Sequence, residues 1–527
     1  MSSSFGLSGF PRLSAAQAEV RAGRDDAASA LVIAHLREHP GEPRGLALLG
    51  SIALQSGALV QSEQFLREAM ARGATGFDVQ RDLAASLHQQ ERLDEALAAY
   101  SHFADRMPDP RLRATKASIL DKLGRTEAAL VEHRVLVKEH PDCAPFWIGY
   151  GHSLRAIGDL NGAVAAYRRS IDADPEYGEA WWALASIKNR LFTDADIAVM
   201  KGLIETAVDL INIIPLHFAL GRALHDRTES AKAFAHFSKG NALRAGTINY
   251  DWRELASEVD DFIARFGADH LAVATTGSPP IGGIPVFLVS MPRAGSTLLE
   301  QMLDRHSMIE AVGELPYARA LVRSAMEIHT RAGPLKVADL VARLGPDEAA
   351  AYGADYLARA ALHRRKDVPY FIDKMPMNWS DIPFIRKILP HARFIDIRRG
   401  GMDCCFSNYV HYFSRAHASS FRLDDIGRCY VDYVRLMDHI VRVAPGLVHK
   451  VDYARLVADP ETELLAALTY LRLDWEPCLL SFHESGRAVR TPSAEQVRRP
   501  LNREGLGAWR AYEQWLGPLS DALGPLA

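Results

Sequence analysis

Three residue types recur at intervals of 34 positions in the first half of the chain, and this recurrence constrains the fold more than any other feature. The pairs are Gly124 and Gly158 (158 − 124), Pro141 and Pro175 (175 − 141), and Trp147 and Trp181 (181 − 147). Apolar residues at helical spacing occupy the intervals between them. A fixed period of this length is typical of stacked repeats, in which each unit buries its apolar face only against its neighbours.

The clearest unit, residues 145–175, predicts two helices joined at Gly158. Gly151 stands where the two helices must approach closely, and Tyr167 fills the groove between them. This unit resembles the tetratricopeptide repeat, whose period is also about 34 residues. Weaker copies occupy residues 50–70, 84–100, 117–141 and 218–237. We therefore expect an all-α solenoid over residues 15–245, and the resemblance implies a groove that binds a peptide, the acceptor or a partner protein.

The second half of the chain has a different pattern. A helical and Gly/Pro-rich linker is expected over residues 246–283, followed by a domain over residues 284–527. Short β-rich runs, each expected to be a strand, lie at residues 284–290, 370–373, 392–398 and 447–453. Helical patterns alternate with these runs, which predicts an α/β domain whose parallel sheet is covered by helices on both faces. Ligands of such domains bind beyond the carboxyl ends of the strands.

A short turn after the first expected strand has the composition of an anion site. Gly295 lets the backbone approach an oxyanion, and the amides from Gly295 to Leu298 open a helix whose dipole favours negative charge. Arg293 adds a full positive charge, and the hydroxyls of the next two residues add donors. The candidate ligands are Arg293, Ala294, Gly295, Ser296, Thr297 and Leu298. The Gly-Lys-Ser/Thr sequence of a nucleotide triphosphatase is missing from this turn.

Other basic residues follow the later strands. Arg398 and Arg399 end the third expected strand, and Ser407 lies eight residues further on (407 − 399), so that a guanidinium and a hydroxyl converge on one phosphate. Lys374 follows the second expected strand, where it either points into the crevice or pairs with its neighbour Asp373. Each of these motifs taken alone is also compatible with solvated surface side chains.

In order and spacing, these elements together resemble the sulfotransferases. The resemblance covers about residues 284–512 and implies that the domain is P-loop-like. It implies that the turn from Pro292 to Thr297 binds the 5′-phosphosulfate of 3′-phosphoadenylyl sulfate (PAPS). Arg399 and Ser407 match the residues that hold the 3′-phosphate, although the Gly400 that follows Arg399 departs from the family pattern and leaves the choice between Arg398 and Arg399 open. Tyr453 matches a tyrosine near the adenine.

Within that family the likeness is strongest to tyrosylprotein sulfotransferases, and bacterial proteins that join tetratricopeptide repeats to such a domain look like the whole chain. Glu314 matches the catalytic base, and Arg499 matches a phosphate ligand. The implied reaction moves a sulfuryl group from PAPS to a hydroxyl, with 3′-phosphoadenosine 5′-phosphate (PAP) as the product. Lys374 and Arg293 would stabilise the shifting charge, and no metal is implied.

Composition limits the setting in which this chain works. The net charge is −4 and the sequence has no long basic run, which disfavours broad nucleic-acid binding. Five cysteines without a CxxC pair favour reduced thiols in a cytoplasm over a disulfide framework. No secretory signal and no apolar run of about 20 residues is apparent, so we expect no membrane span. The relatives, by contrast, are anchored Golgi proteins with disulfides.

Two other functions compete with a sulfotransferase. One is a P-loop-type nucleotide kinase, against which the missing Gly-Lys-Ser/Thr argues. The other is a non-catalytic repeat scaffold, against which the intact Arg293, Glu314, Lys374 and Ser407 argue. The acceptor stays open among a protein tyrosine, a glycan, a lipid and a small alcohol. The oligomeric state, including a homo-oligomer, stays open as well.

Overall fold

The computed structural model describes residues 10–527 except 188–189, 272–281, 331–332, 415, 486, 492–493 and 504. Residues 272–281, which form part of the linker expected over 246–283, therefore lie outside the described residues. The chain divides into two compact units. The first contains the residues up to Glu132 together with Arg319–Leu335, and the second contains His133–Ala318 together with Lys336–Ala527.

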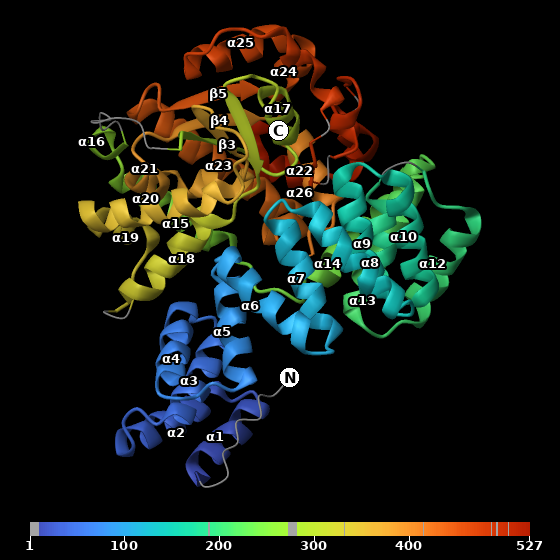
Figure 1. The fold of residues 1–527 in the computed structure, drawn as a ribbon. Coiled ribbons are helices and arrows are strands. Elements are labelled where there is room, and N and C mark those ends of the chain that lie inside the picture. Colours follow the sequence, from blue (N-terminus) through green and yellow to red (C-terminus); the bar gives the residue numbers. More distant parts are fainter. Residues whose placement is uncertain are drawn as a thin grey trace. The chain divides into compact units, whose positions relative to one another are not determined.

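The first unit consists of antiparallel helix pairs (Figure 1). Its helices are α1 (Pro11–Arg21), α2 (Asp25–Glu38), α3 (Pro43–Gln55), α4 (Leu59–Ala71), α5 (Phe77–Gln89), α6 (Leu93–Arg106), α7 (Pro110–Lys122), the first half of α8 (Thr126–Glu139) and most of α18 (Tyr317–His329). The carboxylate of Glu327 on α18 accepts hydrogen bonds from the amides of Val60 (3.0 Å) and Gln61 (2.8 Å). An acid from the second half of the sequence thus satisfies the free amides at the start of α4.

The second unit begins with the repeat that the sequence marks most clearly. Its helical part comprises α9 (Ala144–Ile157), α10 (Leu160–Ala173), α11 (Gly178–Ala185), α12 (Asp194–Thr206), α13 (Leu210–Asp226), α14 (Ser230–Ala245), α15 (Trp252–Arg265) and α16 (Ala268–Leu271). The indole of Trp147 donates to the carbonyl of Pro141 (2.8 Å), and the indole of Trp181 donates to that of Pro175 (2.9 Å). The same contact is therefore made twice, one period apart. Because a Cβ at Gly151 would lie 2.4 Å from the buried Tyr167 ring, the predicted close approach of α9 and α10 requires glycine.

A five-stranded parallel sheet forms the centre of the rest of this unit. Its strands are β1 (Ile284–Val289), β2 (Ile309–Gly313), β3 (Tyr370–Asp373), β4 (Arg393–Arg398) and β5 (Val448–Asp452), arranged in the order β2-β3-β1-β4-β5. Central β1 pairs in parallel with β3 on one side and with β4 on the other. The predicted parallel sheet is confirmed, and four of its strands were expected from the sequence. Strand β2 was not, because its five residues include the charged Glu310.

Helices cover both faces of the sheet. On one face, Val286 and Leu288 of β1 pack against apolar residues of α17 (Ser296–Leu303) and α25 (Pro460–Leu471). On the other face, Phe287 stacks on Phe394 with ring centroids 5.5 Å apart and contacts Tyr356 of α20 (Pro346–Ala361). The remaining helices are α19 (Val337–Arg343), α21 (Ile382–Ile388), α22 (Gly401–Tyr409), α23 (Leu423–Val443), α24 (Tyr453–Ala458) and α26 (Gly517–Leu523). The alternation of side chains along β1 thus separates two apolar layers.

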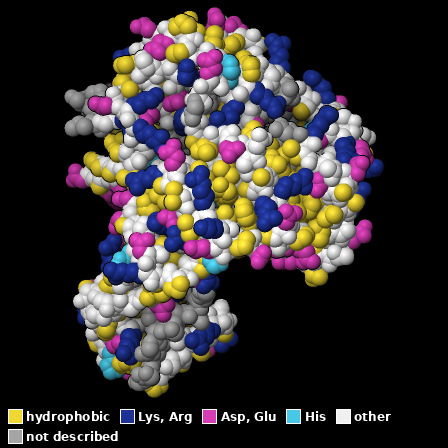
Figure 2. Space-filling view, turned by 45° about the vertical axis from the view of Figure 1, so that its right-hand side comes forward, with side chains coloured by type: hydrophobic (Ala, Val, Ile, Leu, Met, Phe, Trp, Pro, Cys, Tyr) yellow, Lys and Arg dark blue, Asp and Glu magenta, His cyan; other side chains and the backbone are white. Residues whose placement is uncertain are grey.

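The surface and the cysteines match the composition. Acidic and basic side chains are interspersed over the face drawn in Figure 2. All five cysteines carry free thiols, and three of them, Cys404, Cys405 and Cys429, are buried. Across the described ranges, none of the helices combines the length and the apolar character that crossing a bilayer requires.

Candidate functional site

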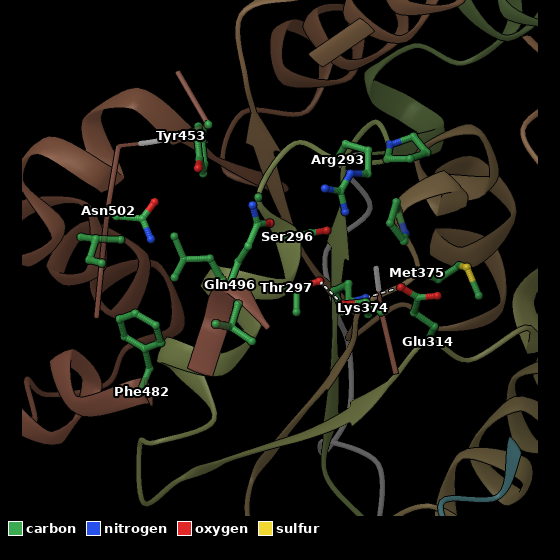
Figure 3. A pocket seen from close by; sticks show the side chains of 18 of the residues that line it. Arg293, Ser296, Thr297, Glu314, Lys374, Met375, Tyr453, Phe482, Gln496 and Asn502 are labelled. Carbon is green, nitrogen blue, oxygen red and sulfur yellow. Dashed lines mark hydrogen bonds and ion pairs between the residues drawn. The ribbon is translucent and has the colours of Figure 1, made fainter. Parts of the chain in front are cut away.

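A cavity of about 310 Å³ opens at the carboxyl ends of β1, β2 and β3. Figure 3 shows Arg293, Ser296 and Thr297 in its middle, with Glu314, Lys374 and Met375 to one side of them. Tyr453, Phe482 and Asn502 lie on the other side. The position agrees with the expectation that ligands bind beyond the carboxyl ends of parallel strands. All of the lining residues belong to the second compact unit.

The turn between β1 and α17 has an unusual backbone. Arg293 has φ +65° and Gly295 has φ +103°, both in the left-handed region. A Cβ at Gly295 would lie 2.3 Å from the ring of Tyr453, so only glycine fits there. The amide of Leu298 donates to the carbonyl of Gly295 (3.0 Å), and the hydroxyl of Thr297 donates to that of Thr491 (3.1 Å). The start of α17 is thus packed against a tyrosine ring, and the helix-start amides that precede Leu298 are the ones suited to an anion.

Two guanidinium groups lie at this turn. Arg399 is buried, donates from Nη1 to the carbonyl of Arg293 (3.0 Å), and lies 5.3 Å above the ring of Tyr453. The pKa of Arg293 is lowered to about 10, mainly by burial and secondly by the nearby positive charge of Arg399. Two like charges held this close together are stabilised when an anion binds between them. The turn is therefore electrostatically prepared for a phosphate or a sulfate.

The structure separates the two consecutive arginines at the end of β4. Arg398 turns away from the anion turn and pairs with Asp396 (3.2 Å) and Asp438 (3.0 Å). Arg399 turns toward the anion turn and also donates to the carbonyl of Gly505. Of the two candidates that the sequence left open, Arg399 is the one that faces the turn.

Two predicted phosphate ligands, Ser407 and Arg499, are not among the described residues that line the cavity. Ser407 is half-buried on α22, one turn beyond Asp403. The same helix contacts the turn through Asn408, whose side-chain amide donates to the carbonyl of Pro292 (2.7 Å). Arg499 is exposed, whereas the nearby residues Val497 and Pro500 line the cavity. Asn408 was not predicted, since an amide two turns into a helix carries no pattern.

An ion pair between Lys374 and Glu314 joins the ends of β3 and β2. Lys374 is 1% exposed, whereas the carboxylate side chain of Glu314 is 41% exposed and reaches the cavity. The lysine therefore pairs with the predicted base and not with its neighbour Asp373. A buried cation that is held by a single half-exposed carboxylate can stabilise negative charge that develops beside it.

Asp373, the residue before Lys374, contacts the loop that carries Glu314. It is fully buried and accepts hydrogen bonds from the amide of Leu315 (3.2 Å) and from the hydroxyl of Tyr356 (2.7 Å). Burial raises the pKa of Asp373 to about 7, although both hydrogen bonds favour the charged form. The contact with Leu315 fixes the loop that carries Glu314, so Asp373 sets the position of the predicted base.

The other wall of the cavity comes from the C-terminal strap, which we define as residues 487–505, described except for 492–493 and 504. Its lining residues are Thr491, Gln496, Val497, Pro500, Leu501, Asn502 and Gly505. Across the described chain, no cluster of three or more His, Cys, Asp and Glu side chains is placed to hold a metal ion. From the sequence, only Arg499 of this strap was predicted as a ligand, and the strap residues that line the cavity were missed.

Fold, anion turn and strand-end charges together define the class of this domain. Residues 285–477 match the sequence profile of the sulfotransferase family, and residues 144–177 match that of the tetratricopeptide repeat. The chain therefore carries a sulfotransferase-family domain and a tetratricopeptide repeat, as the sequence predicted. The family match includes Arg293, Glu314, Lys374 and Arg399, and it ends before the C-terminal strap.

Similar proteins extend the comparison. An uncharacterised protein of Aquifex aeolicus is 30% identical over 382 residues, which are 71% of this chain and 49% of that protein. Protein-tyrosine sulfotransferase 1 of Danio rerio is 24% identical over 234 residues, which are 42% of this chain and 65% of that protein. This chain thus spans about half of the first relative and just under two thirds of the second. Among solved structures, the sulfotransferase domain from the curacin biosynthetic pathway aligns with a TM-score of 0.29 and 16% identity, over 45% of this chain and 99% of that one.

Proposed function

We propose that this protein is a sulfotransferase that moves a sulfuryl group from PAPS to an acceptor hydroxyl. The observation that carries the proposal is the Glu314–Lys374 ion pair, which lies in one cavity with the cationic turn around Arg293. An acid that reaches the cavity beside a buried cation, next to an anion cradle, provides the three functions that the transfer needs. These are a proton acceptor, a charge stabiliser and a donor site.

The residues present fit the donor. Glycine at position 295 lets the ring of Tyr453 pack directly against the backbone of the anion turn, so that the ring and the turn line one cavity. The like-charged Arg293 and Arg399 favour a ligand with more than one negative charge. Ser296, Thr297 and the amides of the turn would hold the 5′-phosphate, while Arg399, Ser407 and Arg499 would hold the 3′-phosphate. Tyr453 lines the same cavity and offers its ring to the adenine.

When bound, PAPS supplies an activated sulfuryl group. Glu314 takes the proton of the acceptor hydroxyl as the acceptor oxygen bonds to sulfur. Lys374 and Arg293 stabilise the negative charge that passes to the 5′-phosphate oxygen as its bond to sulfur breaks. Asp373 holds the loop of Glu314 through Leu315 and so keeps the base in register with the lysine.

For the acceptor, we propose a tyrosine side chain on a protein. The name of the Danio rerio relative and the apolar Met375 and Pro376, which line the cavity just after Lys374, support this choice. A phenol has a flat apolar body that such a surface contacts well. The repeat helices would bind the acceptor protein or a partner, as the tetratricopeptide match suggests. A glycan is the alternative acceptor.

Transfer of radiolabelled sulfuryl from PAPS, measured with the full chain, tests this proposal. The acceptor panel contains a tyrosine peptide, the matched phenylalanine peptide, an oligosaccharide and a small alcohol. We expect label on the tyrosine peptide and none on its phenylalanine counterpart. Label on the oligosaccharide alone would overturn the choice of acceptor but not the activity. Mg²⁺-dependent turnover of ATP without any sulfuryl transfer would overturn the activity in favour of a kinase.

A further inference from the structure

The C-terminal strap rests on the last turn of α9, a repeat helix that lies more than 300 residues earlier in the chain. The carbonyl of Ala156 accepts a hydrogen bond from the amide of Val489 (3.1 Å) and another from Nη2 of Arg498 (3.0 Å). Ala156 is the penultimate residue of α9, where helical carbonyls have no partner within the helix. Two points of the strap, nine residues apart (498 − 489), are thus fixed to one oxygen.

An ion pair next to this carbonyl strengthens the attachment. Arg155 donates from Nε and Nη2 to the two carboxylate oxygens of Glu495, at 2.5 Å and 2.9 Å. Its Nη1 also donates to the hydroxyl of Ser186 (2.7 Å), at the end of α11. The side chain of Arg155 is 12% exposed and that of Glu495 is 7% exposed. A two-point contact between largely buried charged groups fixes orientation as well as distance.

The glycine that joins α9 to α10 also leaves space for the strap residue Arg498. Gly158 has φ +92°, and a Cβ there would lie 2.8 Å from Nη1 of Arg498. The sequence period explains Gly158 as the joint between two repeat helices. The structure adds that this joint leaves space for an arginine of the strap, at a helix end whose dipole favours a cation.

The attached part of the strap is the part that lines the cavity. Gln496 and Val497, the two residues after Glu495, are lining residues, and so is Thr491, which accepts the hydrogen bond from Thr297 of the anion turn. Within the strap, the amide of Ala494 donates to the carbonyl of Thr491 (3.0 Å), so the contacts run from Arg155 to Glu495, along the backbone to Thr491, and on to Thr297. A change at Arg155 would displace the wall that faces the turn.

A second lining segment also rests on repeat helices. Trp182 of α11 packs against His411 with ring centroids 5.2 Å apart, and Phe218 of α13 packs against Tyr412 at the same distance. Phe413, the next residue, lines the cavity. The repeats that follow His133 thus support the cavity from two directions and act as part of its frame.

We propose that Arg155 and Glu495 are positioning residues for the donor, so that the repeat helix α9 completes the nucleotide site of the sulfotransferase-family domain. This inference rests on the proposed function and deepens it. It assigns the repeat array a role within the site, in addition to any role in recruiting an acceptor. The contact joins repeat and strap by two hydrogen bonds to a carboxylate, so lysine in place of arginine keeps the charge and loses the orientation.

Calorimetric titration of PAP into full-length variants, together with hydrogen exchange of the unliganded chain, tests the proposal. For Arg155→Ala we expect PAP to bind roughly tenfold more weakly, because the strap wall is displaced from the phosphates. Amides of residues 494–498 should exchange faster in this variant. Arg155→Lys should fall between the wild type and Arg155→Ala. The charge-swapped double variant Arg155→Glu/Glu495→Arg should regain part of the affinity that each single change loses.

Arg168→Ala is the matched control. Arg168 also makes a two-point ion pair within the repeats, to Asp196 at 2.6 Å and 3.0 Å, and neither residue lines the cavity. We expect its removal to lower the melting temperature without changing the affinity for PAP.

Steady-state kinetics provide a second readout for Arg155→Ala. In this variant the KM for PAPS should rise while kcat stays near that of the wild type, since the strap holds the nucleotide and not the base.

The possible outcomes are distinct. If the wild type binds PAP and Arg155→Ala binds it equally well, the inference is wrong and the proposed function stands. If Arg155→Ala and Arg168→Ala lose affinity to the same extent, the effect is one of general stability and the inference is again wrong. A wild type that does not bind PAP would overturn the proposed function and the inference with it.

Discussion

The two walls of the cavity are built in different ways. The wall that carries Arg293, Glu314 and Lys374 is formed by loops at the ends of three paired strands, and each of these residues follows a strand directly or within a few positions. The opposite wall is the C-terminal strap, whose described residues include one short 3-10 helix, η5 (Gln496–Arg498). Its position depends on contacts with the anion turn and with the repeat helix α9.

We expect this difference to separate the residues that act on the reacting atoms from the residues that bind the nucleotide. A parallel sheet fixes side chains at its carboxyl edge through backbone pairing, which suits groups that must meet reacting atoms within a fraction of an ångström. The strap is held by a few contacts with other parts of the chain, so its position responds to changes far from the reacting atoms. Changes at Glu314 and Lys374 in the sheet wall should therefore reduce the rate more than the affinity, and changes in the strap should reduce the affinity more than the rate.

The largest effect is expected at Glu314. Glu314→Gln keeps the shape of the side chain and removes the proton acceptor, so kcat should fall by about 10³-fold. PAP affinity should stay within about threefold of wild type, since glutamine carries no charge to oppose the phosphates. Single-turnover kinetics and PAP titration on the same preparation provide both values. A variant that keeps near-normal turnover would show that the base lies elsewhere.

A large effect on binding is expected from the cradle. Gly295→Ala places a Cβ 2.3 Å from the ring of Tyr453, at φ +103°, so PAP should bind about 100-fold more weakly from the clash and the strain together. Gly345→Ala is the control, because a Cβ there meets no atom within 4 Å and the backbone is extended (φ −73°). Calorimetry compares the two variants. Equal affinities would show that the packing of Tyr453 against the turn does not shape the ligand site.

Single substitutions of Arg398 and Arg399 test which of these two neighbouring arginines binds a phosphate. Arg399 contacts both the anion turn and Gly505 of the strap, so Arg399→Ala should weaken PAP binding by about 30-fold, the loss expected for charged hydrogen bonds. Arg398→Ala removes an equal charge one residue earlier, from a side chain paired with Asp396 and Asp438. We expect a change of less than about threefold for it. The opposite order would mean that Arg398 is the phosphate ligand.

A smaller effect, on the free energy of unfolding, is expected from the buried Asp373. The pKa of Asp373 is raised from its ordinary value of 3.8 to about 7, so the ionised form is disfavoured in the folded chain. The wild type should therefore lose stability as the pH rises from about 4 to 7, by up to about 4 kcal/mol from this group. Asp373→Asn does not titrate and should gain stability relative to wild type over that range. Urea midpoints at several pH values measure the difference, and parallel curves would contradict it.

Regular elements were predictable from the sequence because a local pattern identifies them. The 34-residue period located the helix pairs, and apolar runs located four strands, so that the sequence alone placed Arg293, Lys374 and Arg399 at strand ends. Strand β2 has no such run, and it becomes a strand by pairing with β3. The partnership of Arg155 with Glu495 joins positions 340 residues apart and leaves no local pattern. The sequence therefore indicated the chemistry at the sheet edge, and tertiary packing determined how the cavity is closed.

Titration of PAP into the wild-type chain, with adenosine 5′-phosphate and ATP as competitors, tests the central claim most directly. The proposed site holds two phosphates of a single nucleotide, one at the amides of the anion turn and one beside Arg399. We therefore expect one PAP per chain, bound at least about tenfold more tightly than adenosine 5′-phosphate, which lacks the 3′-phosphate, or than ATP. PAP binding no tighter than that of adenosine 5′-phosphate would contradict the account.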